Sequence, residues 1–262
     1  MKKEGYWVIR TIVAGEIGEK IKYWVPGEKP TKSMRKIKSD LRKLQQNESN
    51  VVKHVARLIN ENFRPGDCFF APTHSDESIA LLMAGIPEDL PEEERMDYIY
   101  AKAHHQLQLY LRRVRRACDK AGIEFKYIAI TSDMDGTTGE SVRIHHHIIA
   151  PKEVEEILVE KWTLGIVRKK YVWKEPDHFG LAKYLMDQVR RIPDAKKYIP
   201  SRNLIVPVPK DRIAPSGKEV QPPKGAKLLL RTEFRTGRPQ YIRYIIPQKT
   251  KPGGGDDVDL SA

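Results

Sequence analysis

The sequence predicts an α+β fold in which helices pack on a central antiparallel sheet that carries a histidine-containing strand. Three observations indicate this class. The chain has 262 residues, of which 40% are hydrophobic and 31% charged, a composition typical of a globular protein with a substantial core. Along the chain, the expected elements include, in this order, a strand, a helix, a long helix, two strands, a helix, a strand and a helix. Residues 142–149 surround three histidines with apolar residues, which favours a central place in the sheet.

The N-terminal part is expected to form a hairpin followed by basic helices. Residues 6–14 are rich in β-branched and aromatic residues, and residues 19–25 alternate charged and apolar residues after two glycines. Both patterns are typical of paired strands. Residues 31–63 are basic and helical in pattern, and Ser49 is placed to cap a helix over 51–62.

A short buried strand and two helices are expected next. The apolar residues 68–71 predict the strand, and Ser75 or Asp76 can cap the short helix that follows it. A long helix is predicted for residues 91–121, because a proline suits its first turn and Gly122 suits its end.

The histidine strand is expected to lie in an antiparallel hairpin. Residues 125–130 read as its partner strand, since the turn residues 133–136 separate them from 142–149. The remaining expected elements of this part are an amphipathic helix over 153–162, a strand over 165–173 and a helix over 176–191.

The C-terminal residues carry no motif for a chemical activity. A short strand is expected over 204–208, a loop rich in Pro, Gly and Lys over 209–225, and a second hairpin from 227–234 and 241–246. We therefore expect four segments: an N-terminal hairpin with basic helices (1–63), a core (64–206), a C-terminal loop and hairpin (207–250) and a disordered, acidic, glycine-rich tail (251–262).

The charge balance favours a polyanionic partner. The formal net charge is +12, which suits nucleic acid first and an acidic membrane surface second. Two runs of basic residues on expected helices could follow a phosphate backbone, although a solvated helix face is the alternative for each residue. These residues are Arg112, Arg113, Arg115 and Arg116 in one run and Lys32, Arg35, Lys36 and Lys38 in the other.

Cysteine usage and hydropathy predict a cytoplasmic protein. Cys68 and Cys118 are too few for a disulfide framework or a thiolate zinc site, and we expect two buried thiols. The N-terminus lacks the apolar region of a signal peptide, and no run approaches membrane-spanning length, so no membrane partner is expected.

His145 and His147 are the first candidate site residues. In a strand, alternate side chains share a face, so the two imidazoles project together about 7 Å apart along the strand. Two imidazoles on one rigid face form half of a divalent metal site. The alternative is that both histidines are half-buried residues whose hydrogen-bonding groups have partners within the protein. His146 points to the other face, where we expect it to pack or to form hydrogen bonds.

A carboxylate is expected to complete the metal site. Mixed imidazole and carboxylate ligands suit Mn²⁺ better than Mg²⁺, although either ion can handle phosphate. Asp133, Asp135 and Glu140 lie on or near the partner strand, and Asp133 is preferred because it ends the strand opposite the histidines.

Tyr184 is the candidate nucleophile, within an apolar helical segment. A covalent role requires help from a cation or metal, because an unperturbed phenol has a pKa of about 10. The alternative is a core aromatic with a tethered hydroxyl. Lys183 is adjacent, but neighbours on a helix point about 100° apart, so a phosphate contact or a supporting role near the site is expected for it.

The segments GDCFFAPTHSD, IHHHIIA and GLAKYL, in this order, resemble the three motifs of rolling-circle replication initiators of the HUH endonuclease superfamily. The resemblance covers roughly residues 50–205 and points to the phage and plasmid type with a single tyrosine. It implies that His145 and His147 hold Mn²⁺ or Mg²⁺ and that Tyr184 attacks DNA. His74 lies in the first motif and is a candidate further ligand or DNA contact.

The implied reaction nicks single-stranded or hairpin origin DNA by transesterification, leaving a 5′-phosphotyrosine and a free 3′-hydroxyl that can prime replication. The chain has no GxxxxGK[ST] motif for a helicase of its own, so separate host helicase and polymerase partners are implied. Three departures from the family pattern are His146 between the two ligands, Gly180 where some relatives carry a second tyrosine, and Asp187 where others carry a lysine.

Three other functions remain as alternatives. A related single-tyrosine transposase or mobilisation relaxase would use the same residues. A DNA-binding regulator without enzymatic activity would use the basic helices and need neither the histidines nor Tyr184. A zinc hydrolase is disfavoured because the helical HExxH spacing is missing.

Overall fold

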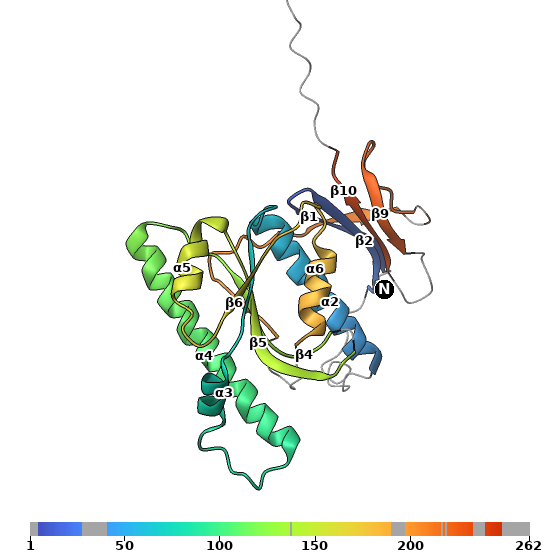
Figure 1. The fold of residues 1–262 in the computed structure, drawn as a ribbon. Helices are drawn as coiled ribbons and strands as arrows, with labels where there is room; N and C mark the ends of the chain where they lie inside the picture. The colour runs from blue at the N-terminus through green and yellow to red at the C-terminus, as the bar shows by residue number, and fades with distance from the viewer. Residues whose placement is uncertain are drawn as a thin grey trace, which may run out of the picture. The chain divides into compact units, whose positions relative to one another are not determined.

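The computed structural model describes residues 5–27, 41–136, 138–189, 197–215, 217, 219–232 and 239–247, with the backbone alone for 41–48. The chain divides into two compact units, one formed by Met1–Thr31 with Val208–Ala262 and the other by Lys32–Pro207 (Figure 1). Each unit contains one five-stranded sheet, and every neighbouring pair of strands is antiparallel. The predicted α+β class is confirmed, with two sheets in place of one.

The histidine strand lies at the centre of the sheet in the larger unit, as its apolar sequence predicts. The strand order is β6-β3-β5-β4-β7. Strand β5 carries the three histidines, β3 and β4 pair with its two edges, and β6 is an edge strand of the sheet. The strand bounds are β3 Cys68–Pro72, β4 Ile128–Met134, β5 Ser141–Ala150, β6 Val167–Tyr171 and β7 Ile199–Pro200.

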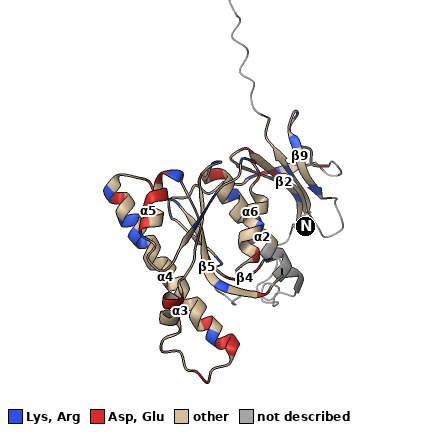
Figure 2. Ribbon diagram, viewed as in Figure 1, with Lys and Arg blue, Asp and Glu red and all other residues tan. Residues whose placement is uncertain are grey.

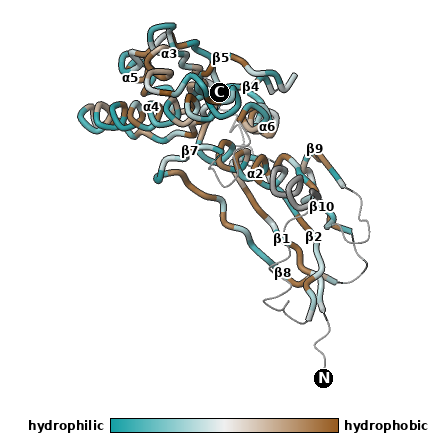
Figure 3. Tube along the Cα trace, turned by 90° about the horizontal axis from the view of Figure 1, so that it is seen from below, coloured by the Kyte–Doolittle hydropathy of each residue, from teal (hydrophilic) through white to brown (hydrophobic). Residues whose placement is uncertain are grey.

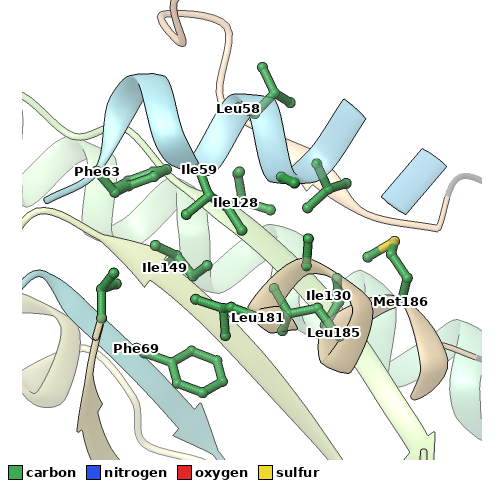
Figure 4. Packing of buried hydrophobic residues seen from close by; sticks show 14 of the residues in the cluster. Leu58, Ile59, Phe63, Phe69, Ile128, Ile130, Ile149, Leu181, Leu185 and Met186 are labelled. Carbon is green, nitrogen blue, oxygen red and sulfur yellow. The ribbon is translucent and has the colours of Figure 1, made fainter. Parts of the chain in front are cut away.

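Helices cover both faces of this sheet. Because side chains alternate along a strand, each central strand contributes to two separate cores. On one face, Ile130 and Ile149 pack with residues of α2 (Leu41–Asn62) and α6 (Phe179–Asp187), as Figure 4 shows. On the other face, Ala129 and Ile148 pack with α4 (Glu92–Ala121) and α5 (Glu155–Glu160). The sheet is therefore a rigid layer between two sets of helices.

The long helix α4 follows the prediction closely. Its end is fixed by Gly122, which adopts a left-handed backbone with φ 67°. Three glutamates occupy its first turn, where they complement the helix dipole. The expected stripe of Leu107, Leu111, Val114 and Cys118 is buried, and the rest of the helix is largely hydrophilic (Figure 3).

Several other element boundaries match less well. The short helix α3 (Asp76–Met83) is capped by Ser75, whose side chain accepts from the Ser78 amide, as expected. The amphipathic helix begins as a short 3₁₀ helix, η1 (Lys152–Val154), before α5. Residues 204–208 form no strand: Leu204 packs into the core, while the Ile205 amide donates to the Asn62 side chain. The Ile205 amide is therefore bonded to a side chain and not to the backbone of a neighbouring strand.

The sheet of the smaller unit joins the two ends of the chain. The strand order is β8-β1-β2-β10-β9. The predicted N-terminal hairpin is β1 (Tyr6–Ala14) with β2 (Ile17–Val25), and the predicted C-terminal hairpin is β9 (Lys227–Thr232) with β10 (Gln240–Ile245). Strand β10 pairs with β2, and β8 (Lys210–Ala214), within the predicted loop, pairs with β1.

A glycine allows β2 and β10 to pack closely. Gly18 lies opposite Tyr244 in the register, and a Cβ on Gly18 would lie 2.4 Å from the tyrosine ring. Ile9, Ile242 and Tyr244 belong to the buried cluster of this unit.

The two units divide the chain differently from the expected segments. Helix α2, expected to belong with the N-terminal hairpin in 1–63, packs its buried residues into the core of the larger unit. The hairpin shares its sheet with residues of the 207–250 segment. The expected tail, 251–262, lies outside the described residues, and so do Lys32, Arg35, Lys36 and Lys38. In the part of the chain that the structure describes, no helix is long and apolar enough to span a membrane.

Candidate functional site

His145 and His147 meet on one face of β5, as the alternation of the strand predicts. Their Nε2 atoms lie 3.1 Å apart. The Nδ1 atom of His145 lies 2.8 Å from the Arg143 carbonyl oxygen, which can only accept a hydrogen bond. In neutral His145 the proton is therefore on Nδ1, and the Nε2 lone pair faces His147.

His147 is held neutral by its surroundings. It is 4% exposed, and its ring stacks on Phe69 with ring centroids 5.5 Å apart. Burial, together with the nearby His145 and Lys170, lowers the pKa of His147 to about 3, although Gln188 acts in the opposite direction. A neutral imidazole is the form that binds a metal ion.

Gln188 supplies a third atom that could bind a metal ion, and the sequence did not indicate this role. Its Oε1 lies 3.1 Å from His147 Nε2, and its side-chain amide donates to the Tyr184 carbonyl at 3.0 Å. The second contact fixes the direction of the carboxamide and turns Oε1 toward His147. The available signal was its spacing, four residues after Tyr184 and therefore about one helical turn away.

Tyr184 lies beside the histidines on α6. Leu181 and Leu185 of the same helix are buried in the core, whereas Tyr184 is 44% exposed. Its ring is edge-on to His147, with centroids 5.7 Å apart, and to Phe69 at 6.2 Å. The helix is thus anchored by its leucines, and it presents the phenol beside the candidate ligands.

His145, His147 and Tyr184 line one pocket of about 320 Å³. Among the described residues, its lining contains three basic side chains, those of Arg143, Arg168 and Lys170, and no acidic one. The lining residues are Phe69, Ala71, Thr73, Val142, Arg143, His145, His147, Arg168, Lys170 and Tyr184. Two imidazoles, a tyrosine and positive charge therefore share a small cavity, which is suited to an anionic group such as a phosphate.

The structure does not bring the expected carboxylate to the histidines. Asp133 is fully buried, but it does not line the pocket, and neither do Asp135 and Glu140. Within the described residues, no group of three or more His, Cys, Asp or Glu side chains is placed to hold a metal. Ser132, and not Asp133, lies opposite His145 in the register, and the pairing of β4 with β5 becomes irregular between Ser132 and Met134, so Asp133 has no position opposite it on β5.

Lys183 does not line the pocket either. Its ammonium group forms an ion pair with Asp187, one turn along α6, and its side chain is 62% exposed. Neighbouring residues on a helix point about 100° apart, which explains why Tyr184 faces the pocket and Lys183 does not.

His146 points away from the pocket, as predicted, and is fully buried. Its Nε2 lies 3.0 Å from His74 Nε2, and its Nδ1 lies 3.2 Å from the Thr131 hydroxyl. His74 is itself 2% exposed and bonds Ser78 through Nδ1 at 2.8 Å. The structure therefore places His74 in a buried chain of hydrogen bonds, away from a position where it could bind DNA or join His145 and His147.

The predicted arginine cluster lies on a different part of the unit. Helix α4 packs against the sheet face that carries Ala129 and Ile148, whereas the pocket is on the face of Ile130 and His147. Figure 2 shows the basic residues of α4 gathered along its C-terminal half. None of the four lines the pocket: Arg112, Arg113, Arg115 and Arg116.

No protein-family model matches this chain, and neither a curated protein nor a solved structure is significantly similar to it. The function therefore has to be inferred from the chemistry of the pocket. Two imidazole nitrogens and one carboxamide oxygen converge beside an accessible phenol. Cis ligands on an ion with bonds of about 2.1 Å lie about 3.0 Å apart. A divalent metal could therefore take the place of the present hydrogen bonds between these atoms, once the proton that His147 Nε2 shares with Gln188 has moved to Nδ1.

Proposed function

We propose that the protein is a metal-dependent endonuclease that nicks single-stranded DNA by tyrosine transesterification, as rolling-circle replication initiators do. The observation that carries this proposal is the position of Tyr184, an exposed phenol whose ring centroid lies 5.7 Å from that of His147 in the cationic pocket. A regulator that only binds DNA would require neither a pocket histidine pair nor a phenol held beside it.

The donor set fits Mn²⁺ or Mg²⁺ through His145, His147 and Gln188. Mixed nitrogen and oxygen donors suit Mn²⁺ best. All three donors are neutral, so they leave the charge of a divalent ion uncompensated, and an anionic phosphate is then a favourable additional ligand. When bound, the ion would polarise the scissile phosphate and stabilise its developing charge.

The side chains of the pocket account for the remaining steps. The Tyr184 oxygen attacks phosphorus and loses its proton, and a phosphorus–oxygen bond to tyrosine forms as the bond to the 3′-oxygen breaks. The 3′-oxygen takes up a proton, which yields a 5′-phosphotyrosine and a free 3′-hydroxyl. Arg168 and Lys170 offset the negative charge of the phosphate throughout.

The biological setting that we propose is initiation of replication at an origin in the cytoplasm. The substrate would be single-stranded or hairpin DNA, and the 3′-hydroxyl would prime a separate host polymerase after a host helicase opens the duplex.

Covalent trapping tests the proposed chemistry. A random-sequence pool of single-stranded oligonucleotides, labelled at the 3′ end, is incubated with the protein and Mn²⁺ and then resolved under denaturing conditions. We expect a labelled protein band, because the tyrosine retains the 3′ fragment, and no such band from a pool labelled at the 5′ end. Chelation of the metal and Tyr184→Phe should each abolish the band.

Tyr98→Phe is the matched control, since Tyr98 is 54% exposed and does not line the pocket. This variant should form the adduct at the wild-type level. Absence of any adduct with wild-type protein in Mn²⁺ and in Mg²⁺ would contradict the nicking activity. An adduct that persists in Tyr184→Phe would assign the nucleophile to another residue.

A further inference from the structure

We propose that Arg168 and Lys170 form an anion-binding subsite that holds the backbone of single-stranded DNA beside the scissile phosphate. This inference rests on the proposed function, because it assigns the position of the strand in the same pocket. It also replaces the arginines of α4, which the sequence favoured, as the cations nearest to the chemistry.

The register of the sheet places both residues on the pocket face. Strand β6 pairs with β3, with Ala71 opposite Arg168 and Phe69 opposite Lys170. Phe69 stacks on His147, so Lys170, opposite Phe69, and Arg168, two residues before Lys170 on the same strand, lie on the face of the candidate ligands. Arg168 and Lys170 both line the pocket.

The neighbouring cation on β6 has a different environment. Lys169 points to the opposite face, where its ammonium group lies 3.1 Å from the Glu155 carboxylate. The Tyr171 hydroxyl donates to the same carboxylate at 3.1 Å. The positive charge on that face is therefore compensated within the protein.

Within the described residues, the two pocket cations of β6 lack such compensation. In the described ranges, neither Arg168 nor Lys170 forms an ion pair, and the pocket lining contains no carboxylate. Lys170 is close enough to His147 to contribute to lowering its pKa, after the larger effects of burial and His145. Two uncompensated cations that face a shared cavity repel one another, and an anionic ligand relieves that repulsion.

Arg143 is a cation of another kind. Its guanidinium donates twice to the His74 carbonyl, at 3.0 and 2.7 Å, and lies 2.8 Å from the Asp76 carboxylate. These contacts fix its direction and compensate much of its charge. The cations free to bind a phosphate are accordingly Arg168 and Lys170.

The size of the pocket favours a single strand as the ligand. A volume of about 320 Å³ is at the lower end of the range for small-ligand cavities, roughly 300–1,000 Å³. It admits a nucleotide-sized part of one strand, and the strand can continue along the exposed edge of the sheet at β6. Backbone binding of this kind depends on charge and carries no base specificity.

The salt dependence of DNA binding tests this subsite. The probe is a fluorescein-labelled oligothymidylate, measured by anisotropy in chelator over a series of KCl concentrations, so that no nicking occurs. For single strands, the slope of log K against log salt changes by about 0.7 for each neutralised phosphate. We expect Lys170→Ala to reduce the slope by about 0.7 and Arg168→Ala/Lys170→Ala to reduce it by about 1.4.

Lys169→Ala is the matched control, because it removes the same charge from the same strand on the opposite face. Its slope should equal that of the wild type. Equal reductions in Lys169→Ala and Lys170→Ala would overturn the subsite, since they would indicate a general surface effect. All three residues are exposed, so these substitutions leave the core intact.

The binding and trapping experiments separate the two proposals. If the double variant has the wild-type slope and the adduct still forms, the subsite proposal is wrong, while the proposal of nicking activity stands. If the slopes change as expected but the wild-type protein forms no adduct, the subsite proposal stands, while the proposal of nicking activity is wrong.

Discussion

His147 and Gln188 face each other across the candidate site, with His147 Nε2 and Gln188 Oε1 3.1 Å apart. Gln188 also donates a hydrogen bond to the carbonyl of Tyr184. The end of α6 therefore positions a candidate ligand and the candidate nucleophile together, relative to the histidines of β5. A small movement of this helix would displace both groups at once.

Removal of the carboxamide should weaken metal binding. Since Gln188→Ala deletes one of three donors, we expect the affinity for Mn²⁺ to fall by about tenfold or more, as measured by calorimetry without DNA. Gln188→Glu retains an oxygen donor and should bind Mn²⁺ at least as tightly as the wild type. An unchanged affinity in Gln188→Ala would show that the third ligand is not this residue.

Substitution of Lys183 should have little effect on the proposed chemistry. Its partner is Asp187 on the exposed side of α6, and an exposed pair at this spacing contributes only about 0.3–0.5 kcal/mol. We expect Lys183→Ala to form the covalent adduct at a rate within about twofold of the wild type. A hundredfold slower rate, with an unchanged melting temperature, would instead place Lys183 in the catalytic machinery.

The buried histidine on the opposite face of β5 should contribute to stability. His146→Ala leaves the facing nitrogen of His74 and the hydroxyl of Thr131 without this partner in a buried position. A lost partner of this kind costs about 1–3 kcal/mol, which urea unfolding would detect as a lower midpoint. His105→Ala, at an exposed position of α4, should change the free energy of unfolding by less than about 0.5 kcal/mol. Equal effects of the two substitutions would contradict a structural role for His146.

Two glycines near the site should respond to alanine in opposite directions. A Cβ on Gly165 would lie 2.1 Å from the Thr73 carbonyl oxygen, whereas a Cβ on Gly180 meets no atom within 4 Å. We expect Gly165→Ala to destabilise the protein by about 1–3 kcal/mol through overpacking. Gly180→Ala, within α6, should stabilise it by about 0.5 kcal/mol, because alanine restricts the unfolded chain. Thermal unfolding of both variants would check the sign, and a neutral Gly165→Ala would mean that the segment at Thr73 can move.

Both thiols should be unreactive in the folded protein. Cys68 and Cys118 are fully buried, and burial raises the pKa of Cys68 to about 12 and that of Cys118 above its usual value. Alkylation requires the thiolate, which for a pKa of 12 is only about one part in ten thousand at pH 8. Mass spectrometry after iodoacetamide treatment should find no adduct in native protein and two in denaturant. Rapid labelling of native protein at pH 8 would indicate that the sheet opens.

The sequence by itself determined the local geometry of this protein. The apolar alternation around the histidines was enough to predict a central strand with His145 and His147 on one face, because strand geometry fixes which side chains share a face. The long helix with its buried stripe and the two terminal hairpins followed from equally local patterns. The turn that Gly122 makes at the end of α4 is a property of glycine itself.

The tertiary structure decided which residues meet. Gln188 reaches His147 across 41 positions of sequence only because the leucines of α6 seat that helix against the sheet. The same packing determined that α4 lies on the face away from the pocket and that an edge strand supplies two of the three cations in its lining. Asp133 was expected beside the histidines because it is near them in the hairpin, but the register pairs Ser132 with His145. The face that a helix covers and the exact pairing of strands depend on contacts between distant residues, which local periodicity does not encode.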